Sequence, residues 1–125
     1  MNKLNFYIGG FHGENIKIFK YYNSIIVQAS DRPVFSSFDK ISQHIKKDQW
    51  INFWNKMNQI NIWDWKTNYF NQEVLDGTQW ELVIGHKDKK LLKIFGSNAY
   101  PDNFQDFLDA LNSLAGTEIT YDKDI

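Results

Sequence analysis

Three histidines are the side chains of this sequence that titrate near neutral pH, so they are the first candidates for acid–base or metal chemistry. His12 lies two residues before Glu14 in a glycine-flanked segment, where the two side chains could share a metal ion or a proton. A structural zinc site needs four ligands and a catalytic one usually three, and the sequence has no HxxxH or HExxH motif. We therefore interpret His12 as a surface-turn residue, and neither His44 nor His86 has a sequence-adjacent nucleophile.

Other catalytic motifs are missing from the sequence. It contains no GxSxG, no GxGxxG, no GxxxxGK[ST] and no cysteine, which excludes disulfides, thiolate ligands and a cysteine nucleophile. Glu73, Asp76 and Glu81 surround one loop and could act as acid and base, but such groupings arise readily among 15 acidic residues. We therefore expect no catalytic residues, no metal and no cofactor, and favour a binding protein over an enzyme. A hydrolase that uses His12 and Glu14 is a third alternative.

Aromatic side chains are the richest feature, with 5 Trp, 6 Tyr and 10 Phe in 125 residues. All five tryptophans lie between residues 50 and 80. We interpret Trp50, Trp54 and Trp80 as core residues whose indole N–H groups donate to backbone carbonyls. The alternative is an exposed aromatic surface that stacks sugars or bases or anchors a protein interface, with Trp63 and Trp65 as its centre.

The formal net charge of −1 hides an uneven distribution. Residues 1–60 carry eight basic and four acidic side chains, whereas residues 61–125 carry six and eleven. The overall balance argues against a nucleic-acid-binding protein that neutralises phosphates. The negative charge near the C-terminus is either a solvated helix face with a frayed tail or an acidic surface for a basic partner. It comes from Asp102, Asp106, Asp109, Glu118, Asp122 and Asp124.

The first third of the sequence alternates apolar and polar residues, as β-strands do. We expect antiparallel strands over residues 4–8, 16–20 and 24–29, and consider a short fourth one over 34–38. Apolar residues spaced by three or four then predict a helix over 49–59 with Asp48 as its N-cap. Residues 39–46 fit a helix or an extended chain, because their few apolar residues do not define a period.

The remaining elements complete an α+β pattern. Residues 62–66 are expected to form a strand that places Trp63 and Trp65 on one face, followed by a loop over 68–77 and a hairpin formed by 78–85 and 92–95. Asp102 and Gln105 have capping-box spacing at the start of the last helix, which Gly116 ends, and 118–121 are considered as a short strand.

The order βββ(β)-α-β-ββ-α predicts one α+β domain over residues 1–125, with a frayed tail considered at 117–125. The expected architecture is a curved, mainly antiparallel sheet of about six strands with two helices on one face. The sequence shows neither a signal peptide nor an apolar stretch long enough to cross a membrane, so we expect a cytoplasmic location and no membrane contact.

Four spaced motifs resemble those of a group of small uncharacterised bacterial proteins. They are WxxFW at 50–54, WxWxxxY at 63–69, DGxxWxLxI at 76–84 and GxNAYPxxFxxF at 96–107. The resemblance covers residues 50–114 and leaves out the N-terminal strands. It implies no assigned activity, cofactor or site residue.

Loops on a rigid sheet usually carry function, so we expect a site among the loop 68–77, the end of the 62–66 strand and the corner 98–101. The candidate ligand- or partner-binding residues are Trp63, Trp65, Tyr69, Asp76, Asn98, Tyr100, Asp102, Asp106 and Asp109. The leading hypothesis is a non-enzymatic cytoplasmic protein that binds a macromolecule, such as an immunity or antitoxin-like inhibitor of a basic protein partner. The alternative is a domain that binds a small ligand or carbohydrate on an aromatic platform.

Overall fold

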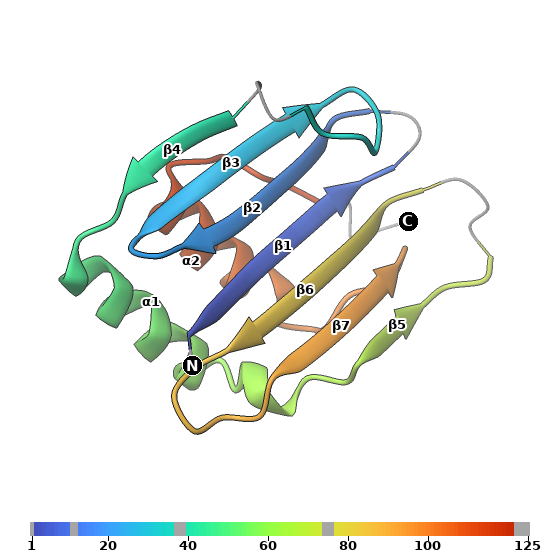
Figure 1. The fold of residues 1–125 in the computed structure, drawn as a ribbon. Helices are drawn as coiled ribbons and strands as arrows, with labels where there is room; N and C mark the ends of the chain where they lie inside the picture. The colour runs from blue at the N-terminus through green and yellow to red at the C-terminus, as the bar shows by residue number, and fades with distance from the viewer. Residues whose placement is uncertain (1, 11–12, 37–39, 74–76, 122–125) are drawn as a thin grey trace.

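The computed structural model describes residues 2–10, 13–36, 40–73 and 77–121, and these form an α+β fold (Figure 1). One sheet has the strand order β4-β3-β2-β1-β6-β7-β5, and its neighbouring strands are antiparallel except for the parallel pair β5–β7. The helices α1 (Lys47–Gln59) and α2 (Phe104–Ala115) cover one face. The strands are β1 (Lys3–Gly9), β2 (Asn15–Tyr21), β3 (Ser24–Ser30), β4 (Lys40–His44), β5 (Asn68–Phe70), β6 (Gln79–Gly85) and β7 (Leu92–Ser97).

The predicted fold class is confirmed, with seven strands in place of about six. The period-2 pattern explains the core, because alternate residues of a strand point to the same face. In the central strands β1 and β6, Leu4 lies opposite Ile84 and Phe6 lies opposite Leu82, and all four side chains are buried against the helices. No helix in the described part of the chain is long and apolar enough to span a membrane.

Residues 40–44 settle the open question between helix and extended chain, because they form the edge strand β4 beside β3. All five of its side chains are exposed, which explains why no hydrophobic period was visible in this segment. The fourth strand is therefore not where it was considered. Residues 34–36 lie outside any strand, and residues 37 and 38 are outside the described residues.

The strand predicted over residues 62–66 is wrong. Residues Ile62–Asp64 form η1, a 3₁₀ helix, which follows α1 after a left-handed turn at Asn61 with φ 54°. The strand in this region is β5, within the predicted loop, where it pairs with β7. Ile62 is fully buried beneath the turn, so the short apolar run reflects the packing of a helix end rather than strand alternation.

Both helices begin differently from the predictions. Helix α1 starts at Lys47 and has Asp48 inside its first turn, while the Gln49 Oε1 accepts a 2.9 Å hydrogen bond from the backbone N–H of Lys46. Helix α2 starts at Phe104, and the predicted capping box of Asp102 and Gln105 is not formed.

Helix α2 has Asn103 as its N-cap residue, and the Asn103 side chain bonds to other segments of the chain. The Gln105 Nε2 donates to Asp109 at 2.8 Å, so this side chain points along the helix surface and not back to its start. At the other end, Gly116 has φ 69°, which confirms it as the residue that ends the helix in the left-handed region.

The segment after α2 is packed against the core as far as residue 121, and the short strand considered at 118–121 is absent. Residues 117–121 form no strand, and Ile119 is buried. The Asn112 side chain accepts a 2.9 Å bond from the Ile119 N–H and donates a 3.0 Å bond to the Ile119 carbonyl. The Tyr121 ring contacts Phe104 at 4.9 Å between centroids. Residues 122–125 lie outside the described residues.

Candidate functional site

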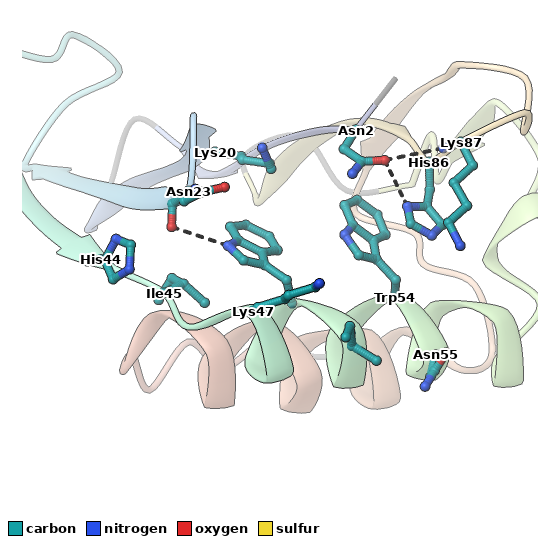
Figure 2. A pocket seen from close by; sticks show the side chains of 12 residues that line it. Asn2, Lys20, Asn23, His44, Ile45, Lys47, Trp54, Asn55, His86 and Lys87 are labelled. Carbon is teal, nitrogen blue, oxygen red and sulfur yellow. Dashed lines mark hydrogen bonds between the residues drawn. The ribbon is translucent and has the colours of Figure 1, made fainter.

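A cleft of about 650 Å³ lies between α1 and the chain turns at one end of the sheet (Figure 2). We call it the α1 cleft. Its walls come from five places: the residue before β1, the end of β2 with the β2–β3 turn, the end of β4, the inner side of α1, and the turn after β6. The lining residues are Asn2, Lys20, Asn23, His44, Ile45, Lys47, Trp50, Ile51, Trp54, Asn55, His86 and Lys87.

Two tryptophans one helical turn apart form the base of the cleft. Trp50 and Trp54 are four residues apart on α1, so they share a face of the helix. Their rings lie 6.2 Å apart between centroids with planes 18° apart. The Trp50 Nε1 donates to the backbone carbonyl of Asn23 at 3.2 Å, and the Lys20 ammonium lies 5.3 Å from the Trp50 ring centroid. These contacts attach α1 to the β2–β3 turn.

His86 completes the row of rings. Its imidazole is stacked on Trp54, and its Nδ1 lies 2.9 Å from the Asn2 Oδ1. The same oxygen accepts a bond from the backbone N–H of Lys87, which identifies it as an acceptor and places the His86 proton on Nδ1. Burial and the neighbouring positive charge of Lys87 lower the pKa of His86, with a smaller opposing effect from Asp88. The ring is therefore neutral at neutral pH.

The charged groups of the cleft have one sign. Lys20, Lys47 and Lys87 line it, and the twelve described lining residues include no aspartate or glutamate. Among the described residues, neither Lys20 nor Lys47 forms a salt bridge. The N-terminus of α1 adds a partial positive charge on the same side. A negatively charged group would therefore enter a region of favourable potential.

The lining residues offer donors and positive charge rather than carboxylates. They offer amide, ammonium, imidazole and indole groups, and they contain no hydroxyl, thiol or carboxylate side chain. In the described parts of the chain, no group of three or more His, Cys, Asp or Glu side chains could hold a metal ion. The arrangement can donate hydrogen bonds and positive charge to an oxyanion and present apolar ring edges to its neighbouring atoms.

The aromatic candidates predicted from the sequence lie elsewhere and do not share one open surface. Trp65 is 8% exposed and Tyr69 is half-buried, and both rings contact the fully buried ring of Trp80. Trp63 is half-buried on η1, where its Nε1 donates to the Asn58 Oδ1 at 2.7 Å. The 3₁₀ turn causes this divergence, because residues two apart in such a turn do not point the same way.

The corner over residues 98–101 has a structural role. Asn98 adopts φ 56°, and its Oδ1 accepts a 2.8 Å bond from the backbone N–H of Thr78. A Cβ at Gly77 would lie 1.8 Å from that oxygen, so only glycine allows the two segments to approach. The Tyr100 ring lies nearly parallel to that of Trp80, at 6.3 Å. Both candidates join the end of β7 to β6 and α2.

The acidic candidates are accessible. Asp102, Asp106 and Asp109 are exposed at the start and along the outer side of α2. Asp76 lies outside the described residues, as do His12, Asp122 and Asp124. None of the described candidates lines the α1 cleft.

The sequence indicated some properties of the α1 cleft residues one by one, but not that these residues lie together. Trp50 and Trp54 are buried, as predicted, but they also form the base of a cleft. The excess of lysine in residues 1–60 was visible too, whereas its convergence with Lys87 depends on the pairing of β1 with both β2 and β6.

Comparison of the chain with models of known protein families gives no match, and comparison with curated protein sequences gives none either.

Proposed function

We propose that this chain is a non-enzymatic binding protein whose α1 cleft takes an anionic ligand. The single observation that carries the proposal is the composition of the cleft. Three lysines and a pair of tryptophans line about 650 Å³ without a carboxylate among the described lining residues. This volume lies within the range of roughly 300–1,000 Å³ that is usual for small-molecule sites. The proposal keeps the small-ligand alternative and moves it from Trp63, Trp65 and Tyr69 to the residues of the α1 cleft.

Physical chemistry supports an anion over a neutral sugar in this position. The Trp50 and Trp54 rings are nearly parallel and offset, the Lys20 ammonium lies over the Trp50 ring, and the His86 imidazole is stacked on Trp54. Sugars stack on open ring faces, whereas anions are attracted to the positive ring edges and to ammonium groups. The lysines are compact charges on flexible stems, which suits carboxylate and phosphate groups alike.

Titration of the purified chain with phenyl phosphate, followed by tryptophan fluorescence, tests this proposal. We expect saturable binding that weakens as salt is raised, because exposed charges are screened over about 10 Å at 0.1 M ionic strength. The double variant Lys20→Gln and Lys47→Gln should bind about tenfold more weakly. Lys56→Gln is the matched control, since this lysine is exposed on the same helix and does not line the cleft. Equal affinities of both variants, or binding that is insensitive to salt, would contradict an anion site in the cleft.

A second proposal rests on the outer side of α2, where Asp102, Asp106 and Asp109 are exposed. These carboxylates support the hypothesis of a macromolecule-binding protein, such as an immunity or antitoxin-like inhibitor of a basic protein. A pull-down from the native host should recover a stoichiometric partner, and changing the three aspartates to lysine should release it. Recovery of a partner by the charge-reversed chain at the wild-type level would speak against this surface. A cytoplasmic location is part of the same proposal.

A further inference from the structure

The indole N–H of Trp54 differs from those of the other four tryptophans. Trp54 is 4% exposed, yet no hydrogen-bond acceptor for its Nε1 occurs among the described residues. The other four indoles each have an acceptor: the carbonyl of Asn23 for Trp50, the Oδ1 of Asn58 for Trp63, the Oδ1 of Asn103 for Trp65, and the carbonyl of Ala99 for Trp80. Trp54 is therefore the one tryptophan whose indole donor is not used by another described residue.

This N–H, which no described residue accepts, is accessible from the α1 cleft. Among the described residues every fully enclosed side-chain nitrogen or oxygen has a hydrogen-bond partner, so the Trp54 Nε1 is not sealed inside the core. Trp54 lines the cleft, and Figure 2 shows its ring rising from α1 toward Asn2 and His86, with the ring nitrogen on the side where Lys20 is drawn. The donor therefore faces the space that the lysines surround.

The surrounding contacts hold this donor in place. The His86 imidazole covers one side of the Trp54 ring at 4.4 Å between centroids, and its own Nδ1 is bonded to Asn2. The Phe53 ring meets Trp54 at 5.1 Å. A donor whose position is determined before binding loses little conformational freedom when the ligand arrives.

We propose that Trp54 Nε1–H donates a hydrogen bond to one oxygen of an organic oxyanion, a carboxylate or a phosphate monoester, whose charge is matched by Lys20 and Lys47. This inference rests on the proposed function of the cleft and names its anchoring donor and its ligand class. The cleft is much larger than an oxyanion, and Ile51, which is 48% exposed, contributes apolar surface to it. The ligand is therefore amphipathic, with an apolar body beside the charged group.

Proton–nitrogen correlation spectra of the indole groups test this inference directly. The five tryptophans give five indole cross-peaks, which single Trp→Phe variants assign. Phenyl phosphate and phenylacetate serve as probes with the two anionic groups, and 2-phenylethanol serves as the uncharged control. We expect the Trp54 cross-peak to move to higher proton frequency and to shift more than the other four, because only its N–H gains an acceptor. The uncharged control should leave it in place.

Affinity gives the second readout. Trp54→Phe keeps an aromatic ring and removes the N–H, so we expect the wild-type affinity for the better probe to fall about tenfold, which corresponds to about 1.4 kcal/mol. Trp63→Phe is the matched control, because its indole is bonded to Asn58 on the far part of α1. If Trp54→Phe folds poorly, the cross-peak shift in the unmodified chain still decides the question.

The possible outcomes separate the two proposals. Binding that depends on Lys20 and Lys47 but leaves the Trp54 cross-peak unmoved would overturn the inference and leave the cleft proposal standing. An equal shift with 2-phenylethanol would also overturn it, because a neutral acceptor would then suffice. A response to only one of the two anions identifies the charged group and supports the inference. Absence of any anion-dependent change would overturn both.

Discussion

Trp54 and His86 are stacked with their ring centroids 4.4 Å apart and their planes 9° from parallel. The pair joins the middle of α1 to the turn that follows β6, two segments that are far apart in the sequence. It also holds the imidazole in a neutral form beside Lys87 and places the indole N–H in the cleft. A structural contact and the candidate binding site therefore depend on the same two rings.

The lowered pKa of His86 predicts a pH-dependent stability. Its pKa in the unfolded chain is about 6.5, whereas burial lowers it in the folded chain, so the unfolded state binds the proton more readily. His86 therefore contributes stability that is complete above about pH 6.5 and is lost as the pH falls through its folded pKa. Urea denaturation between pH 8 and pH 5 should show a smaller loss of stability for His86→Gln than for the wild type.

His44→Gln is the control for this experiment, because His44 is exposed at the end of β4. It measures the effect of replacing an exposed histidine by glutamine. The same slope for His86→Gln and the wild type would show that His86 takes up no additional proton on unfolding.

Asn103 links three segments and should be important for stability. Its Oδ1 accepts a 2.9 Å bond from the Trp65 indole, and its Nδ2 donates a 2.6 Å bond to the carbonyl of Ile60. Asn103→Ala leaves both groups without a partner, and we expect it to lower the free energy of unfolding by about 2 kcal/mol or more, as measured by urea denaturation. Asn52→Ala, an exposed change on α1, should cost less than about 0.5 kcal/mol. Similar losses for the two variants would refute the bridging role.

The absence of a side chain at Gly96 leaves room for the Trp80 ring to lie over the neighbouring strand β7. The two residues are paired across β6 and β7, and a Cβ at Gly96 would lie 1.9 Å from the fully buried Trp80 Nε1. Gly96→Ala should therefore destabilise the fold by about 1–3 kcal/mol through overpacking. Combining it with Trp80→Phe, which removes the clashing part of the ring, should cost less than the sum of the two single changes in thermal denaturation. Strict additivity would mean that the two positions do not interact.

Asn112 holds the segment that follows α2. Its side chain bonds both the N–H and the carbonyl of Ile119, and its Oδ1 also accepts from the Thr117 hydroxyl at 2.8 Å. Asn112→Ala should lower stability by about 1–3 kcal/mol and increase the hydrogen exchange rate of the Ile119 amide. Ser113→Ala, an exposed neighbour, should change neither quantity. An Ile119 amide that stays equally protected in Asn112→Ala would contradict this role.

The elements with a strong hydrophobic period were predictable from the sequence. The strands β1, β2, β3, β6 and β7 and the helices α1 and α2 all correspond to predicted elements, because each buries one regular face. The elements that were misassigned lack such a face. Strand β4 is exposed on every residue, and β5 has three residues of which Tyr69 alone points toward the core.

The polar partners of the helix ends were less predictable. Asp102 had the residue type and spacing of a capping residue, yet Asn103 occupies the N-cap position. The Asn103 side chain instead bonds a tryptophan 38 positions earlier in the chain. Spacing along the chain reports local bonds well, but it contains no information about a partner that only folding brings near.

By itself the sequence determined the fold class, the buried faces of the main elements and the burial of Trp50, Trp54 and Trp80, because these follow from local periodicity and residue type. Only the tertiary structure decided where charges and donors meet. Lys20 lies on β2, Lys47 on α1 and Lys87 in the turn after β6. They meet at the α1 cleft because β1 pairs with both β2 and β6, which brings the ends of these two strands to the same side of α1. Burial is a property of one residue and its periodic neighbours, whereas a binding site requires the convergence of distant segments, which sequence spacing does not encode.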